Sequence, residues 1–397
     1  MMQTLQSELT NELFENILPY WMTKMPDVEN GGFYGRIDGQ EHVHKQANKG
    51  LVLNARILWT FAAAYRLRKH PRYLETAERA FAYIREYFID KEYGGVYWEL
   101  DYRGRPVSTR KQIYAQGFAL YGFSELYRAT GNPDALEEAL RMYDRIERLA
   151  HDARYGGYLE ALSREWQPIG DMKLSARDAN VPKSMNTHLH ILEPYTNLLR
   201  IRRDPALEKA QEALIRIFCD HIVSAETHHL TLFFDERWNK KSTVVSYGHD
   251  IEAAWLLYEA AEVLGNETLT GRVKQVALSL VDAAYEGLQE AGGMMYESEG
   301  ARSDRDRHWW IQAETVAGSV YAYRLSGDAS YLDVAKKTWQ YIRHHILDKV
   351  NGEWVWSAGP DGRQNRTDDK AGFWKCPYHN ARMCMEVMNW NELKEHL

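Results

Sequence analysis

The chain has 397 residues, 45% hydrophobic and 26% charged, a balance typical of a folded globular protein rather than a disordered or collagen-like chain. Its formal net charge of -7 provides no excess of basic residues for a phosphate backbone or an acidic membrane surface, so we expect neither nucleic acid nor a membrane as partner. With three cysteines, no apolar run of membrane-spanning length and no secretion signal, we expect a cytoplasmic protein.

A short glycine-aromatic unit recurs along the chain at intervals of roughly 60 to 70 residues. The clearest copies are ENGGFYGRIDGQ from Glu29, EYGGVYWELDYRGRP from Glu92 and RYGGYLEALSREWQP from Arg154. Weaker copies start at His228, Gly292 and Asn351. Each copy pairs alternating aromatic and polar residues with a turn, such as Asp38-Gly39 or Asp361-Gly362, which predicts a short β-hairpin.

Two helical stretches with apolar residues at three-to-four spacing separate successive units. Pro71, Pro133 and Pro205 stand where one helix of a pair should stop and the next begin. We therefore predict about twelve helices in six pairs, forming a single catalytic domain over residues 1–397. Closed into a ring, six pairs make an all-α (α/α)6 barrel with the hairpins at one rim. An open solenoid is the alternative, and closure is favoured because neither end has a polar capping repeat.

Polar and aromatic residues gather at six predicted helix starts, which hairpins at one rim would bring together. These residues are Asn54, Arg56, Tyr114, Gln116, Asn186, His188, His190, His249, Asp250, Glu252, His308, Trp309, Trp310, Glu314, Trp374 and His379. Helix N-termini carry unpaired N–H groups and a partial positive charge, so their convergence favours a developing oxyanion. The 13 tryptophans and 25 tyrosines exceed the needs of a core, and such rings form stacking platforms for sugars.

The segment SYGHDIEAAW, residues 246–255, places three ionisable groups at the start of a helix that otherwise looks buried. His249 and Glu252 are three residues apart on one helix face, so the carboxylate could orient or charge the imidazole. Asp250 points elsewhere, which favours a structural role. His249 and His379 are the strongest candidates for proton transfer, because histidine titrates near neutral pH.

Other candidates also have structural interpretations. We expect His190 and His308 to be satisfied structural histidines or supports for site residues. Trp309 is expected in the core, whereas Trp310 faces another direction and could stack on a sugar ring. Glu314 lies one turn below Trp310 and is expected to pair with an arginine in the core.

The histidine spacing disfavours a metal site. His188 and His190 are two residues apart, which places them on different sides of a helix, so both cannot bind one ion. The HExxH pattern is also absent from the sequence. We expect neither a metal nor another cofactor.

Six segments closely resemble cellobiose 2-epimerases, within the larger N-acylglucosamine 2-epimerase superfamily, and the similarity spans essentially the full chain. They are LNARILWTFAAAYR, KSMNTHLHILEPYTNLLR, FFDERW, VSYGHDIEAAWLL, RHWWIQAETV and FWKCPYHNARMCMEVM. The resemblance implies an (α/α)6 barrel that interconverts glucose and mannose, without a cofactor, at the reducing end of a β-1,4-linked disaccharide. Cellobiose and lactose are the implied substrates, with mannobiose in the reverse direction.

The resemblance also implies roles for individual residues. Residues matching His249 and His379 act as general acid and base at C2, and those matching His188 and Arg56 assist ring opening and hold the enediolate oxygens. The resemblance further implies that Asn186 and Glu252 hold hydroxyls or orient histidines, that Trp310 and Trp374 stack on the sugars, and that Asp178 binds the second sugar. Three further candidates for substrate binding are Tyr114, Trp309 and Glu314.

Other functions remain open at the level of sequence. Relatives that act on free mannose or glucose share the central residues. A glycoside hydrolase would use two of the carboxylates Asp178, Glu252 and Glu314, but it gives no role to paired histidines. A non-catalytic sugar-binding protein is the third alternative. We expect a monomer, because a closed barrel needs no partner subunit.

Overall fold

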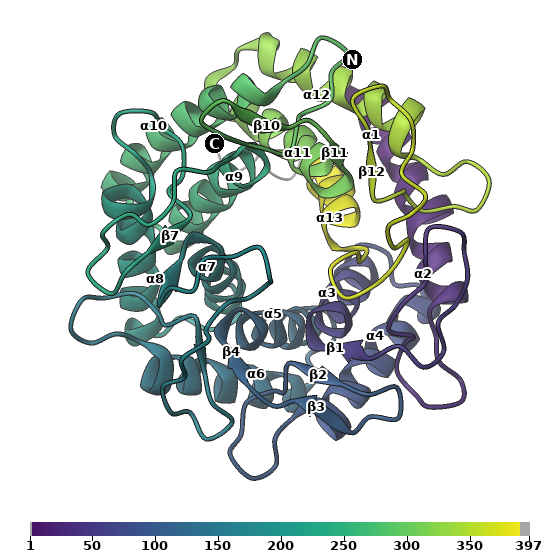
Figure 1. The fold of residues 1–397 in the computed structure, drawn as a ribbon, viewed down its shortest axis with the longest axis vertical. Helices are drawn as coiled ribbons and strands as arrows, with labels where there is room; N and C mark the ends of the chain where they lie inside the picture. Colours follow the sequence, from purple (N-terminus) through teal and green to yellow (C-terminus); the bar gives the residue numbers. More distant parts are fainter. Residues whose placement is uncertain (1, 390–397) are drawn as a thin grey trace.

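Six helices surround the axis of a closed ring and six more cover them from outside (Figure 1), in a computed structural model that describes residues 2–389. The inner helices are α3 (Leu51–Leu67), α5 (Ile113–Thr130), α7 (Met185–Leu199), α9 (Tyr247–Leu264), α11 (Trp309–Ser326) and α13 (Tyr378–Met388). The outer helices are α1 (Met2–Asn11) continued by α2 (Leu18–Lys24), then α4 (Pro71–Tyr83), α6 (Pro133–Arg145), α8 (Pro205–Ile217), α10 (Glu267–Ala284) and α12 (Ala329–Tyr341).

Contacts between the first and last helices close the ring. Each inner helix packs on the next from α3 to α13, and α13 packs in turn on α3 and on α1. The N-terminal helix therefore completes the sixth pair with the last inner helix. The predicted all-α (α/α)6 barrel is confirmed, and the open solenoid is excluded.

Inner and outer helices differ in the way their sequences bury surface. Inner helix α3 is buried without a break from Leu51 to Ala64, because it contacts protein on every side. Outer helices α4, α6 and α8 begin at the expected prolines, after His70, Asn132 and Asp204, whose side chains accept hydrogen bonds from the first turn. Among residues 2–389, none of the helices is both long and apolar enough to cross a bilayer.

Two glycines allow the inner helices to approach closely. A Cβ atom on Gly117 would lie 2.3 Å from the carbonyl oxygen of His190, and one on Gly318 would lie 2.5 Å from the side chain of Ile251. Both distances are shorter than non-bonded contacts allow. Gly117 thus brings α5 against α7, and Gly318 brings α11 against α9.

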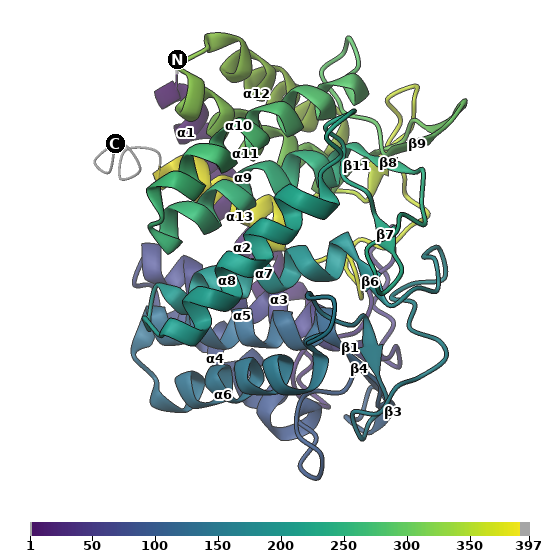
Figure 2. The ribbon, with the colours of Figure 1, turned by 90° about the vertical axis from the view of Figure 1, so that its left-hand side faces the viewer.

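Short strands lie together at one end of the barrel (Figure 2). A strand directly before each of five inner helices pairs with a strand in the next unit. The pairs are β1 (Lys49–Gly50) with β2 (Glu99–Leu100), β4 (Lys111–Gln112) with β5 (Ala161–Leu162), β6 (Lys183–Ser184) with β7 (Phe233–Phe234), β8 (Val245–Ser246) with β9 (Glu297–Glu299), and β11 (Arg307–His308) with β12 (Ser357–Ala358).

The rim strands depart from the prediction of one hairpin per unit. Hairpins of paired strands form only where β2 meets β3 (Pro106–Ser108) and β9 meets β10 (Arg302–Asp304), among the residues described. Other turns close through single bridges, such as Ile37 with Val43. Most of the pairing connects neighbouring units, and it holds the starts of five of the six inner helices.

The fourth residue of an inner helix binds the loop beneath it in the same way in four units. Gln116, His188, Asp250 and Gln312 each accept a hydrogen bond from a loop backbone N–H, at 2.8 to 2.9 Å. The donors are Val96, Tyr158, Leu230 and Met294. Because a buried N–H needs a partner, this position must carry an acceptor.

Replacing Gly117 with alanine tests the close packing of α5 on α7. We expect the Gly117→Ala variant to lose about 1 to 3 kcal/mol in free energy of unfolding, because the new methyl group forces the helices apart. Gly271→Ala is the matched control, since Gly271 lies exposed in α10 with no atom within 4 Å of a new Cβ. It should gain about 0.5 to 1 kcal/mol. Chemical denaturation measures both values, and equal effects would contradict the packing argument.

Candidate active site

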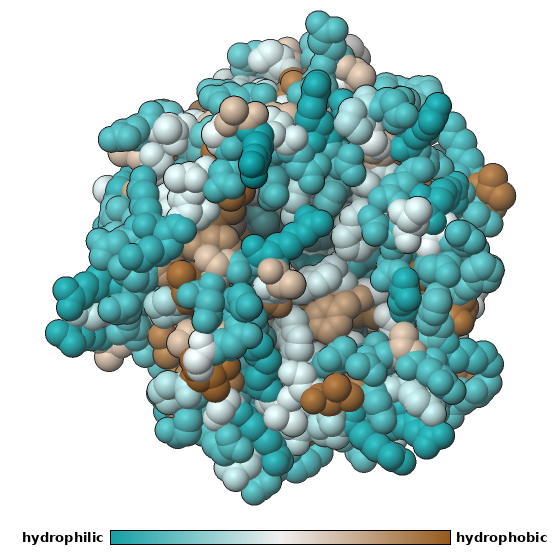
Figure 3. All heavy atoms as spheres, viewed as in Figure 1, coloured by the Kyte–Doolittle hydropathy of each residue, from teal (hydrophilic) through white to brown (hydrophobic). Residues whose placement is uncertain are grey.

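The inner-helix starts enclose a cavity of about 450 Å³ that opens in the middle of the strand-bearing end. Figure 3 shows this opening as a hollow surrounded by mainly hydrophilic residues. Ten of the twelve predicted site residues line the cavity, and His188 and Glu314 do not. The ten are Arg56, Tyr114, Asp178, Asn186, His249, Glu252, Trp309, Trp310, Trp374 and His379.

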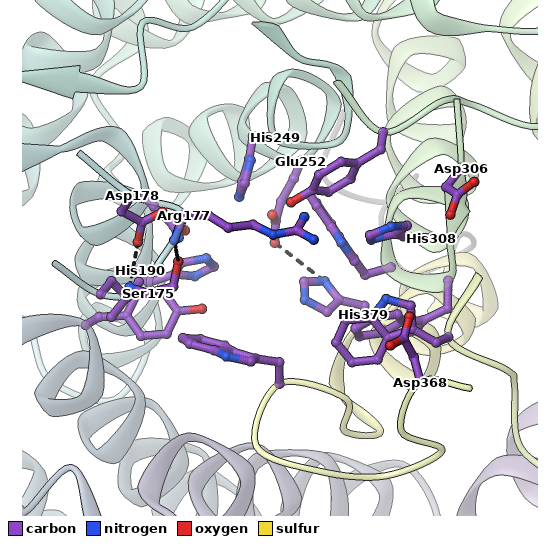
Figure 4. Close-up of a pocket in the computed structure, with 18 of the residues that line it drawn as sticks. Ser175, Arg177, Asp178, His190, His249, Glu252, Asp306, His308, Asp368 and His379 are labelled. Carbon is purple, nitrogen blue, oxygen red and sulfur yellow. Dashed lines mark hydrogen bonds and ion pairs between the residues drawn. The ribbon is translucent and has the colours of Figure 1, made fainter. Parts of the chain in front are cut away.

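His249 and His379 project into the cavity from α9 and α13 (Figure 4). The ring of Trp310 lies near both, 4.8 Å from His249 and 5.5 Å from His379 between centroids. Nδ1 of His249 shares a hydrogen bond with Oγ of Ser246 at 2.7 Å, and Nδ1 of His379 donates to Oε1 of Glu314 at 2.7 Å. Each imidazole is thus oriented through Nδ1, which leaves Nε2 for a bound molecule.

Burial keeps both imidazoles neutral at physiological pH. It lowers the pKa of His249 to about 3, helped by the neighbouring His190 and His379. It also lowers the pKa of His379 to about 3, against the opposing effect of Glu314. A neutral imidazole has a lone pair on one nitrogen, so each of these side chains is chemically a base.

A buried arginine, Arg382, joins three carboxylates below the histidines. Its Nη2 atom lies 2.7 Å from Oε1 of both Glu252 and Glu314, and Nη1 donates to Glu193 and contacts the Tyr378 hydroxyl. The expected arginine partner of Glu314 is therefore Arg382. Arg382 and Glu193 were not among the predicted site residues, although both lie in segments that carry the resemblance, because the groups they bind lie on other helices.

The pKa values of two of these carboxyl groups shift in opposite directions. Burial raises the pKa of Glu252 well above its usual range, and the neighbouring Glu314 adds to that effect. Burial acts on Glu314 too, but Arg382 and His379 outweigh it and lower the pKa to about 2. These shifts favour the ionised form of Glu314 and the protonated form of Glu252. Oε2 of Glu252 has no hydrogen-bond partner among the residues described, so it can serve a ligand.

The expected pairing of Glu252 with His249 is wrong. Glu252 binds Arg382 and lies 3.7 Å from Nδ1 of His379. The same three-residue spacing does produce a carboxylate-oriented imidazole in α7, where His190 Nδ1 donates to Glu193 at 2.6 Å. His190 also lines the cavity, as does His308, so neither is confined to the core.

His188 does not fit the role in ring opening that the resemblance gave it. Its Nδ1–H donates to the Ser184 carbonyl at 2.7 Å, and its Nε2 accepts from the Tyr158 N–H at 2.9 Å. Both nitrogens are therefore occupied, the side chain has no exposed surface, and it lies outside the cavity. It is the α7 counterpart of Gln116 and Gln312. His190, four residues after Asn186, takes the place facing the cavity.

Arg56 contributes a buried positive charge that no carboxylate neutralises directly. Its Nη2 donates to the Tyr114 hydroxyl at 2.8 Å, and Nη1 lies 3.5 Å from Cys376 Sγ. The guanidinium carbon lies 4.3 Å from the Phe118 ring centroid and 4.8 Å from that of Tyr378. No Asp or Glu oxygen in residues 2–389 lies within 4.0 Å of it. This charge is available for an anion in the cavity.

The mouth of the cavity combines aromatic rings with an acid. Trp309 is only 3% exposed and packs on Trp356 at 4.7 Å between centroids, so its core packing and its place in the wall coexist. Trp374 packs beside Trp98 at 5.9 Å. Asp178 accepts a hydrogen bond from the Ser175 N–H at 2.8 Å, and burial raises its pKa.

Two sets of side chains come close enough to share a metal ion. They are His190 with Glu193 and Glu252, and Glu252 with Glu314 and His379. Arg382 already binds all three carboxylates, so this cluster has its cation in the chain itself.

Known proteins resemble this chain over almost its whole length. The model of the family described as N-acylglucosamine 2-epimerase (GlcNAc 2-epimerase) matches residues 32–382. Cellobiose 2-epimerase of Bacteroides fragilis is 54% identical over 98% of this chain and 100% of its own length, and that of Ruminococcus albus is 38% identical over 96% and 98%. The solved cellobiose 2-epimerase from Bacillus thermoamylovorans superposes with a TM-score of 0.94 at 38% identity, covering 98% of this chain and 100% of that one.

His188→Gln tests the structural role of His188 through pH. Burial lowers the pKa of His188 to about 4, below its unfolded value of about 6.5. Between pH 6.5 and pH 4, the His188 imidazole therefore binds a proton in the unfolded chain but not in the folded one. The wild type loses stability as the pH falls through this range. Glutamine keeps the loop hydrogen bond without titrating. We expect the variant to gain about 3 kcal/mol relative to wild type between pH 7 and pH 4. A pH-independent difference in urea denaturation would contradict this.

Proposed function

Because the chain belongs to the N-acylglucosamine 2-epimerase family, we propose that it reversibly epimerises the reducing-end glucose of β-1,4-linked disaccharides at C2, without a cofactor. Cellobiose and lactose are the proposed substrates, and mannobiose reacts in reverse. The observation that carries the proposal is the pair of neutral histidines, His249 and His379, whose Nε2 atoms are unoccupied and which both lie beside the ring of Trp310. The ring acts as one catalytic domain and as a monomer, since one chain supplies every group needed.

Ring opening comes first, because the C2 hydrogen becomes acidic only when C1 is a carbonyl. A proton must leave the C1 hydroxyl and another must reach the ring oxygen. His190 is suited to this transfer, since Glu193 orients its Nδ1 and the ring lines the cavity. Oδ1 of the adjacent Asn186 has no hydrogen-bond partner among the described residues and can hold a sugar hydroxyl.

Proton removal from C2 follows. Nε2 of one histidine takes the proton and becomes an imidazolium, and the pair of electrons moves toward C1 and its oxygen. The carboxylate of Glu314 stabilises the imidazolium that forms on His379, as an aspartate does in serine-protease triads. The Ser246 hydroxyl holds His249 more weakly, because it carries no charge.

The resulting cis-enediolate carries its negative charge on oxygen. Arg56 offers an unneutralised positive charge, and the neutral acid Glu252 offers an O–H donor. A well-placed donor of this kind contributes about 3 kcal/mol to the transition state. Because burial keeps both imidazoles neutral, the other histidine first takes a proton from solvent, which the negative charge of the enediolate favours. It then delivers that proton to C2 from the opposite face, which gives the epimer, and the first histidine returns its own proton to solvent. Exchange of the acid and base roles makes the reaction reversible.

The alternatives account less well for these groups. A glycoside hydrolase needs two carboxyl groups across the scissile bond, but Glu252 and Glu314 lie together on one nitrogen of Arg382, and Glu314 is not in the wall. A non-catalytic sugar-binding protein has no need of two neutral bases. Action on free mannose or glucose would use the same inner residues, and Asp178 at the mouth favours a longer substrate.

Proton NMR of cellobiose in D2O tests the reaction. We expect the wild type to replace the C2 hydrogen with deuterium and to form glucosyl-mannose. His379→Asn should reduce the rate by about hundredfold or more, since it removes one acid–base group. His344→Asn, at an exposed position, is the matched control and should keep the wild-type rate. Release of free glucose would contradict the proposal in favour of hydrolysis.

Two neighbouring substitutions in α7 separate the catalytic histidine from the structural one. His190→Gln should reduce epimerisation by about hundredfold, because the residue that moves protons during ring opening is lost. His188→Gln should keep the rate within about threefold, because glutamine provides the same loop contact at this position in α5 and α11. Initial rates with cellobiose give both values, and the reverse order would return the role to His188.

A further inference from the structure

Arg177 extends across the mouth of the cavity. It lies in the segment 174–178, between β5 and β6, all of which lines the cavity. Figure 4 shows its side chain directed from this segment toward the middle of the opening. Burial raises the pKa of Tyr296 to about 12, and the opposing effect of Arg177 places the guanidinium beside the Tyr296 hydroxyl. Arg177 therefore spans two rim segments that are more than a hundred residues apart in the chain.

The guanidinium is free to bind a ligand. No carboxylate oxygen in residues 2–389 lies within 4.0 Å of it, and the side chain is exposed. An arginine has five N–H donors in a planar fork, whereas the Tyr296 hydroxyl occupies a single position. Arg177 lines the cavity together with the aromatic side chains of Tyr296, Trp310 and Trp356.

His308 forms the wall beside this space. It is 9% exposed and stacks on Tyr296, with centroids 4.2 Å apart and planes inclined at 19°. Burial lowers its pKa to about 4, so the ring is neutral and can both donate and accept a hydrogen bond. Its position directly before α11 places it one residue ahead of Trp309 and two ahead of Trp310.

We propose that Arg177 and His308 bind the sugar unit linked to the reducing one, and that they set the preference for disaccharides over free hexoses. This inference rests on the proposed function. The reacting sugar must meet His249 and His379 beside Trp310. Arg177 belongs to the rim segment that lines the same cavity, so a second sugar unit that extends from the reacting one toward the opening meets it.

The charges at the mouth indicate a neutral sugar in this position. Carboxylates line the same wall and supply acceptors for hydroxyl groups, namely Asp178, Asp304, Asp306 and Asp368. They would repel a uronic acid, since like charges in contact are unfavourable. The fork of Arg177 can donate to two adjacent hydroxyls at once.

Comparison of two substrates tests the proposal. For wild type and Arg177→Ala, kcat and KM are measured with cellobiose and with free mannose by C2 exchange in D2O. We expect the ratio of kcat/KM for cellobiose to that for mannose to fall at least about tenfold, mainly through the KM for cellobiose, as for loss of a charged donor. Arg177→Lys should lie between, because it keeps the charge without the fork.

Two further variants complete the test. His308→Phe keeps the stack on Tyr296 but removes the polar nitrogens, and it should shift the same ratio in the same direction. Arg302→Ala, at an exposed position of β10 outside the wall, is the matched control and should leave the ratio unchanged. A ratio within twofold of wild type in Arg177→Ala and His308→Phe would overturn the inference.

Failure of the proposed function would look different. It would be seen as absence of C2 exchange by the wild type with both sugars. Calorimetric binding of cellobiose and of glucose then decides the role of Arg177. A preference for cellobiose that disappears in Arg177→Ala supports the inference, and equal affinities in wild type and variant overturn it.

Discussion

Arg382 is the interaction on which the interior depends. Its guanidinium binds glutamates from α7, α9 and α11 while its own backbone belongs to α13, so one side chain joins four of the six inner helices. Removing one partner of a buried ion pair leaves an uncompensated charge, which is far more costly than a lost surface contact. The same cluster fixes His379 through Glu314. Stability of the ring and orientation of the proposed catalytic base His379 therefore have one physical source.

The charges in this cluster also determine the chemistry above it. The pKa shifts favour a protonated Glu252, because it is buried and lies beside Glu314, and an ionised Glu314, because Arg382 and His379 outweigh its burial. One glutamate can thus support a developing imidazolium while the other donates a hydrogen bond to an oxyanion. Arg56 lies outside this arrangement, among aromatic rings, and its charge stays available for the substrate.

The sequence predicted the ring, the helix pairs and most of the cavity wall, because helical periodicity, prolines and glycine-rich turns are local signals. It did not separate His188 from His190, since two histidines in one turn carry the same composition signal. Position along the helix determines which histidine faces the cavity. The fourth residue of an inner helix, such as His188, faces the loop, whereas the second and sixth face the axis, as Asn186 and His190 do. Arg382 and Arg177 could not be found, because their partners lie on other helices or across the mouth.

In the segment SYGHDIEAAW, residues 246–255, the three ionisable side chains point in three different directions. His249 faces the cavity, Glu252 reaches the axis at Arg382, and Asp250 turns outward to accept hydrogen bonds from the Leu230 N–H and from His229, at 2.8 and 2.7 Å. Each ionisable group has its own partner, which offsets the loss of hydration on burial. The start of α9 can carry three such groups only because it borders the loop with Leu230 and His229, the Arg382 cluster at the barrel axis, and the cavity. Closure of the ring brings these three surroundings together.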